Sequence, residues 1–168
     1  MVASRRSGRV SAGLFGWIHD AGVGELVDVG PGQLTGPSYV QILEEVLLPS
    51  VGAMLFPEPE PFYLIQDNSP VHTSRVVKEW FARHTRITVM PHPARSPDLN
   101  PIEHVWAAMQ KGMPDRQHRC RATVVNDALQ AWEHLRSPSG RDLTHTLVAS
   151  MPRRLNEVLA EGGGYTRY

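Results

Sequence analysis

The stretch FYLIQDNSPVH, residues 62–72, decides the fold class of this 168-residue chain. It opens with four apolar residues, Phe62 to Ile65, which predict a short strand buried in a sheet. Asp67 follows almost at once, so the strand brings a carboxylate to its carboxyl end, the edge where open α/β sheets place their sites. The residues after it, Pro70 among them, favour a turn that leads into the next element.

A second buried strand is predicted at residues 87–90, ITVM, and the segment Ser74–His84 between the two runs has apolar residues at helical spacing. A strand, a crossover helix and a second strand form a parallel pair, with a right-handed crossover in nearly all proteins. We therefore expect residues 62–66 and 87–89 to be parallel neighbours.

The flanking segments add a hairpin and further helices. Val10–Ile18 and Gly24–Val29 predict a hairpin around Asp20, and Ser38 is expected to cap a helix that Pro49 ends. Later helical patterns follow Pro101, begin at a Thr123 cap and cover residues 143–159, with Trp80, Trp106 and Trp132 expected in the core. The fold class is therefore α/β, a mixed sheet flanked by helices.

Charge is balanced over the whole chain, with 17 Lys and Arg against 17 Asp and Glu, but not along it. Residues 42–67 carry five acids and no Lys or Arg, whereas residues 68–121 carry nine basic against four acidic side chains and five of the eight histidines. A cationic segment of this kind is compatible with a phosphate-rich partner such as DNA. The lone Cys120 allows neither an internal disulfide nor a Cys-rich zinc site, and no apolar run reaches the roughly 20 residues of a membrane span. We expect a soluble, intracellular protein without membrane contact.

Two carboxylates are candidates for a site. Asp67 follows a strand and Glu103 lies in the first turn of a predicted helix, so both can reach one sheet edge if the two strands are neighbours. Carboxylates suit Mg²⁺ or Mn²⁺, and paired ions of this type assist displacement at a phosphodiester. We expect the two carboxylates to lie within about 8 Å of each other.

Each acid also has a purely local interpretation. Asp67 could cap the turn at Asn68–Pro70, and Glu103 could complete a capping box with Asn100 as N-cap and Pro101 in the first turn. His72 and His104 stand next to the acids, but a single histidine more often lies at a surface or a cap. Local chemistry alone leaves these alternatives open.

Taken together, two longer motifs resemble those of mariner-like transposases of the DDE superfamily. Residues 62–72, FYLIQDNSPVH, are similar to the motif of that family's second aspartate, and residues 96–106, SPDLNPIEHVW, to the motif of its third acid. The 35 residues between Asp67 and Glu103 match the family spacing, and the hairpin and the ending SMPRRL with GGYTRY at residues 150–155 and 163–168 also fit. The resemblance covers nearly the whole chain.

The resemblance implies an RNase H-like fold and metal-dependent DNA cleavage and strand transfer. It implies that Asp67 and Glu103 are catalytic acids and metal ligands, with Mg²⁺ or Mn²⁺ as the cofactor and no small-molecule cofactor. DNA is the implied partner, a homodimer the implied assembly, and the nucleus the implied location.

One feature departs from the family pattern. The first catalytic aspartate of the family lies on a central strand before the hairpin, whereas here no Asp or Glu precedes Asp20, which falls in the predicted turn. We therefore expect residues 1–168 to be a single partial catalytic domain that lacks the central strand and the helix-turn-helix DNA-binding region, binds metal weakly and is inactive alone. The alternative is a non-enzymatic nucleic-acid-binding remnant or a domesticated transposase-derived protein.

Overall fold

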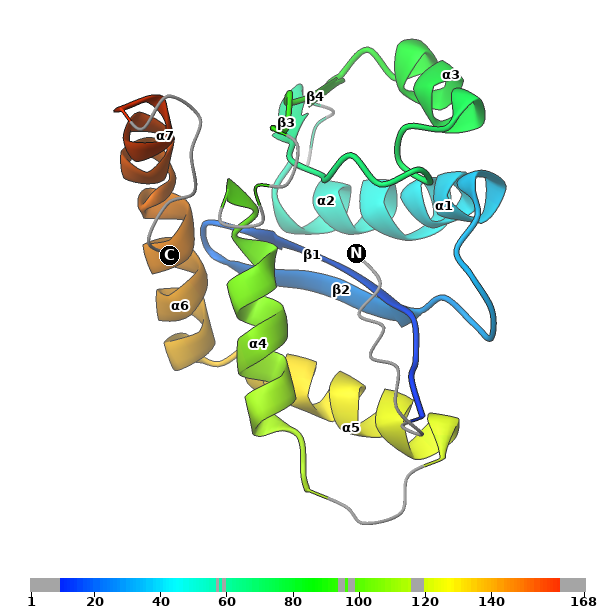
Figure 1. The fold of residues 1–168 in the computed structure, drawn as a ribbon, viewed down its shortest axis with the longest axis vertical. Coiled ribbons are helices and arrows are strands. Elements are labelled where there is room, and N and C mark those ends of the chain that lie inside the picture. Colours follow the sequence, from blue (N-terminus) through cyan, green and yellow to red (C-terminus); the bar gives the residue numbers. More distant parts are fainter. Residues whose placement is uncertain are drawn as a thin grey trace. The chain divides into compact units, whose positions relative to one another are not determined.

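The computed structural model describes residues 10–56, 58, 60–93, 96, 99–115 and 120–160 (Figure 1). Residues 158–160 are described by their backbone only. Over that part of the chain, no helix has the length and apolar character of a membrane span. The chain divides into two compact units, Met1–Gly16 with Gly24–Ala94 and Trp17–Val23 with Arg95–Tyr168.

The predicted hairpin is present and supplies strands to both units. Strand β1 covers Leu14–His19 and β2 covers Gly22–Asp28, so Asp20 and Ala21 form the turn as expected. Gly22 has φ +151°, a conformation that L side chains rarely adopt and that glycine adopts without strain.

Three consecutive helical segments of the first unit correct two expectations. They are α1 (Gly36–Ile42), the π-type segment η1 (Leu43–Leu47) and α2 (Leu48–Met54). The N-cap is Thr35 and not Ser38, which occupies the third helical position and completes a capping box with Thr35. Pro49 does not end the helix, because the widened π turn before it changes the hydrogen-bond register and places Pro49 in the first turn of α2.

The parallel pairing was predicted correctly, but the expected burial of the first strand was not: Tyr63 is 74% and Ile65 40% exposed, and Phe62 and Leu64 are half-buried. Strand β3 (Phe62–Leu64) pairs in parallel with β4 (Ile87–Val89), with Phe62 opposite Ile87 and Leu64 opposite Val89. Between them lies α3 (Arg75–Arg83), which packs against α1. Over the described residues, the strands form two two-stranded sheets, β1–β2 and β3–β4.

Trp80 of α3 is the centre of a buried cluster in this unit. Its side chain is 0% exposed, stacks on His84 with ring centroids 3.8 Å apart, and donates its Nε1–H to Glu44 Oε1 at 2.9 Å. Leu43, Leu47 and Val77 are also fully or almost fully buried. The expectation that Trp80 belongs to the core is therefore confirmed.

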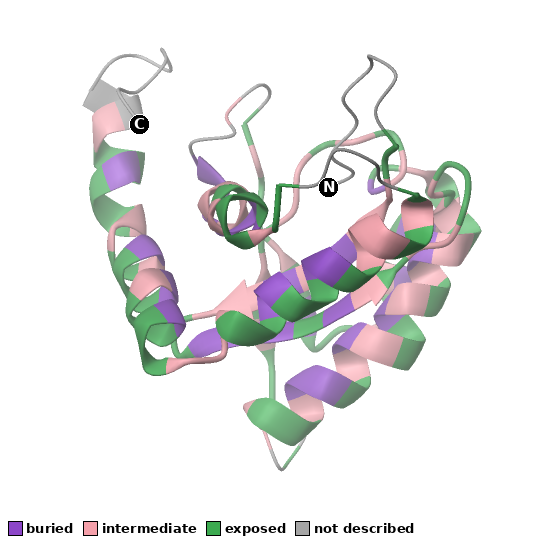
Figure 2. Cartoon of the chain, turned by 90° about the horizontal axis from the view of Figure 1, so that it is seen from below, coloured by how far each residue is buried: buried purple, intermediate pink, exposed green. Residues whose placement is uncertain are grey.

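The second unit is helical apart from its part of the hairpin. Its helices are α4 (Ile102–Gly112), α5 (Arg121–His134), α6 (Pro138–Ala149) and α7 (Met151–Ala160). Trp106 and Trp132 are buried with ring centroids 5.2 Å apart, which confirms both as core residues, and buried positions recur along one side of the helices (Figure 2).

The N-cap of α5 differs from the expected Thr123. Cys120 is the N-cap of α5, and the hydroxyl of Thr123 instead accepts the backbone N–H of Cys120 at 3.0 Å. The GGYTRY ending lies outside the described residues.

Candidate active site

Asp67 lies just beyond the carboxyl end of β3. The ladder between the two parallel strands extends one step past β4, because Met90 N–H donates to the Leu64 carbonyl at 2.8 Å. Asp67 follows three residues later and is thus held close to the sheet edge by backbone pairing. This is the position that the sequence predicted for the acid.

The carboxylate of Asp67 is oriented by two donors on the same oxygen. Its Oδ1 accepts the backbone N–H of Ser69 at 3.1 Å and lies 2.7 Å from Nδ1 of His72. The side chain is 25% exposed, and the hydrogen bonds that the described residues make to this carboxylate go to Oδ1. One oxygen is therefore held by the protein while the other is left for an outside ligand, a donor arrangement that fits a hard cation such as Mg²⁺.

The surroundings keep Asp67 ionised. Partial burial acts to raise the pKa of this carboxyl, but the hydrogen bond from the Ser69 backbone and the charge and hydrogen bond of His72 outweigh it, so the pKa is lowered. A carboxylate that is anionic at neutral pH is the form that a divalent cation binds.

His72 and Tyr39 form a buried support behind Asp67. The His72 side chain is 7% exposed, and burial lowers the pKa of His72 despite the neighbouring carboxylate. The ring of Tyr39 lies 4.5 Å from that of His72, and the Tyr39 hydroxyl donates to Gln66 Oε1 at 2.7 Å. The sequence analysis did not identify this support; the only signal for it was a histidine five residues after an acid.

Glu103 lies in the first turn of α4, as predicted, and its side chain is half-buried. The proposed capping box is not formed as expected: the N-cap is Pro101, and Asn100 contributes its backbone carbonyl to the Glu103 N–H at 3.1 Å. The turn-and-cap interpretation of Asp67 is confirmed in part by its bond to Ser69.

A buried arginine supports the turn that carries Glu103. Arg154 of α7 is 4% exposed, donates its Nε–H to Ser150 Oγ at 2.8 Å and places a guanidinium nitrogen 3.2 Å from His104 Nε2. Because a guanidinium can only donate, His104 accepts here through Nε2. Burial and the charge of Arg154 both lower the pKa of His104.

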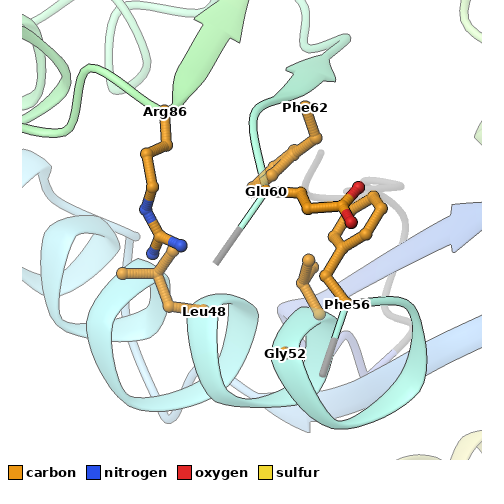
Figure 3. Close-up of a pocket in the computed structure, with 7 residues that line it drawn as sticks. Leu48, Gly52, Phe56, Glu60, Phe62 and Arg86 are labelled. Atoms are coloured by element: carbon orange, nitrogen blue, oxygen red, sulfur yellow. The ribbon is translucent and has the colours of Figure 1, made fainter. Parts of the chain in front are cut away.

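The two acids belong to different compact units, so their expected separation stays a prediction. Within the described part of the chain, no three His, Cys, Asp or Glu side chains are grouped as a metal site. A pocket of about 190 Å³ lies elsewhere, against α2 and the amino ends of β3 and β4 (Figure 3). Phe62 and Arg86 line it, but Asp67 does not, so this pocket is not part of the candidate active site.

Comparison with known proteins gives one family and one fold. Residues 14–125 match the family described as DDE superfamily endonuclease. The Tcb1 transposase of Caenorhabditis briggsae is 32% identical over 97% of this chain and 56% of its own length. The Tc1 transposase of Caenorhabditis elegans is 35% identical over 64% of this chain and 37% of its own length. The chain thus spans about half the length, or less, of these transposases.

A solved structure shows the same fold. The crystal structure of the catalytic domain of Mos1 mariner transposase superposes with a TM-score of 0.79 at 23% identity, over 94% of this chain and 77% of that one. Related Mos1 structures contain Raltegravir with Mn or with Mg, and one is a paired-end complex with the left transposon end. The expected RNase H-like fold is confirmed by this similarity.

Proposed function

Because this chain belongs to the DDE superfamily of endonucleases, we propose that Asp67 and Glu103 are two acidic ligands of a metal-dependent DNA-cleaving site. The observation that carries the proposal is the geometry of Asp67. Its carboxylate stands beyond a parallel strand pair, is kept ionised, and has one oxygen fixed by Ser69 and His72.

When bound, Mg²⁺ or Mn²⁺ would activate the attacking oxygen and neutralise charge on the leaving oxygen of a phosphodiester. The presence of Mn or Mg in the related Mos1 structures supports this choice of cofactor. In this chain, Asp67 would supply Oδ2, and Glu103 would supply a carboxylate at a helix amino terminus. We keep the assignment of residues 1–168 to one partial catalytic domain as a prediction.

DNA is the proposed partner. The excess of basic side chains in residues 68–121 suits a phosphate backbone, and a related Mos1 structure is a complex with a transposon end. Homodimerisation and a nuclear location are proposed on the family relationship alone.

The second candidate is a nucleic-acid-binding protein without cleavage activity. Within residues 1–168, the observation behind it is Asp20, which lies in the hairpin turn and has its carboxylate 2.8 Å from Nδ1 of His145. A carboxylate in that position does not replace an acid on a strand before the hairpin.

Manganese binding tests the proposal directly. Mn²⁺ would be titrated into the chain and its free concentration followed by electron paramagnetic resonance. Loss of an outer-sphere partner typically weakens metal binding by about 10- to 100-fold. We expect Asp67→Ala and Glu103→Ala, which remove proposed direct ligands, each to weaken Mn²⁺ binding by at least that factor. Glu79→Ala, which removes an exposed acid from α3, should bind as the unmodified chain does. Equal binding by all four proteins would refute the proposal.

A further inference from the structure

His72 makes the most specific contact in the candidate active site. Its Nδ1 lies 2.7 Å from Asp67 Oδ1 and 3.2 Å from the Asp67 backbone oxygen, and both of those oxygens can only accept. Nδ1 therefore carries a hydrogen, and in the neutral ring this is the Nδ1–H tautomer, with a lone pair on Nε2.

We propose that His72 is a positioning residue, which fixes the Asp67 carboxylate so that Oδ2 faces a divalent cation. This inference rests on the proposed function of Asp67 as a metal ligand. A carboxylate held through one oxygen keeps less rotational freedom, so a cation that binds the other oxygen loses less entropy. Outer-sphere donors of this kind orient ligands in other metal sites and affect affinity strongly.

The structure holds His72 in place from two sides. The turn that carries it is closed by the Thr73 N–H and the Thr73 hydroxyl, both of which donate to the Ser69 carbonyl at 3.0 Å. On the other side lies Tyr39 of α1, which is 3% exposed and bonds through its hydroxyl to Gln66, the residue before Asp67. One tyrosine thus contacts residues on both sides of the acid in sequence, and the imidazole has little room to rotate.

The second unit offers a matched comparison. His145 Nδ1 lies 2.8 Å from Asp20 Oδ1, nearly the same contact, but its side chain is 68% exposed and that of Asp20 61%. A contact of the same type without burial should not affect the candidate active site. This pair serves as the control for any general effect of removing a histidine.

The first test uses Mn²⁺ titration of His72→Phe, His72→Asn and His145→Phe, with folding checked by circular dichroism. His72→Phe keeps a ring against Tyr39 but removes the donor, and we expect binding about 10- to 100-fold weaker. His72→Asn retains an N–H donor near the place of Nδ1 and should bind within about threefold of the unmodified chain, less than the loss caused by removing an outer-sphere partner. His145→Phe should have no effect.

The second test needs no metal. Long-range ¹H–¹⁵N correlation spectra of the histidine-labelled chain should show His72 as the Nδ1–H tautomer. Asp67→Ala should change the ¹⁵N shift of Nδ1, because the Oδ1 acceptor is lost while the backbone oxygen of residue 67 remains. A role limited to packing predicts no such dependence on Asp67.

The outcomes separate the two proposals. If His72→Phe binds Mn²⁺ as the unmodified chain does while Asp67→Ala does not, the positioning role is wrong and the metal ligand stands. An Nε2–H tautomer in the unmodified chain would also overturn the positioning role. If Asp67→Ala itself leaves binding unchanged, the proposed function fails, and the positioning proposal fails with it.

Discussion

The hydrogen bond between Trp80 and Glu44 is predicted to carry a measurable part of the stability of the first unit. Trp80 is 0% exposed, and its Nε1–H donates to Glu44 Oε1 at 2.9 Å. Glu44→Ala removes the acceptor, and because Glu44 is itself exposed, water can reach part of its place, so the lost hydrogen bond should cost about 1 kcal/mol. We expect the free energy of unfolding, measured by urea denaturation and circular dichroism, to fall by that amount.

The neighbouring Glu45 provides the control. Its carboxylate accepts from the exposed Gln41 side chain, so Glu45→Ala should change the free energy of unfolding by less than about 0.5 kcal/mol. In the Trp80→Phe background, which has no indole N–H, Glu44→Ala should have an equally small effect. If Glu44→Ala is no more destabilising than Glu45→Ala, or is equally destabilising in both backgrounds, the reasoning is wrong.

Two further predictions concern stability. Gly140→Ala would place its Cβ 2.6 Å from the Leu135 Cα, against backbone that cannot move aside, and should lower the free energy of unfolding by about 1–3 kcal/mol. Gly52→Ala, with nothing within 4 Å of its Cβ, should raise the free energy of unfolding by about 0.5–1 kcal/mol. Urea denaturation measures both changes. Burial lowers the pKa of His19, His72 and His104, so their contribution to stability is full above about pH 6.5 and declines as the pH falls below it. Melting temperatures should therefore be lower at pH 5.5 than at pH 7.5, and His19→Asn should reduce that difference.

The strands could be predicted because their signal is local. Four consecutive apolar residues before Gln66 indicate a strand, and the amphipathic segment after them fixes the parallel pairing. The same run did not predict burial correctly, because Tyr63 and Ile65 are exposed in this structure. The helix caps could not be predicted in the same way. Thr35 and Ser38 each bond to the backbone N–H of the other, so either hydroxyl fits an N-cap when only the sequence is read.

In the candidate active site, too, only the features with a local sequence signal could be predicted. The strand end placed Asp67, and a helix start placed Glu103. The contacts around the two acids depend on where α1 and α7 lie. Tyr39 of α1 contacts His72, which is 33 positions further along the chain, and Arg154 of α7 contacts His104, which is 50 positions earlier. No local pattern encodes such distances along the chain, and a buried His or Arg is exceptional unless something pairs with it. Reading the sequence alone therefore found the acids and missed their supports.

The last prediction concerns catalysis by the 168-residue chain on its own. Two divalent ions bring four positive charges, and Asp67 with Glu103 neutralises two of them. Mg²⁺ gives up its water reluctantly, so a site with two carboxylates should hold it weakly and in poorly defined geometry. Asp20 cannot easily supply the third, because it lies in the hairpin turn and its carboxylate contacts His145.

Weak and imprecise metal binding should abolish turnover, since a displacement of about 1 Å at a reacting group already costs about 100-fold in rate. We therefore expect no nicking of supercoiled plasmid by the purified chain with Mg²⁺ or Mn²⁺, while DNA binding persists through the basic residues of the 68–121 segment. Asp67→Ala and Glu103→Ala should be run beside it. If the unmodified chain nicks the plasmid and both substitutions abolish the nicking, two carboxylates suffice and the prediction is wrong. If neither substitution alters the nicking, the activity does not depend on the proposed metal-binding acids and comes from a contaminating nuclease.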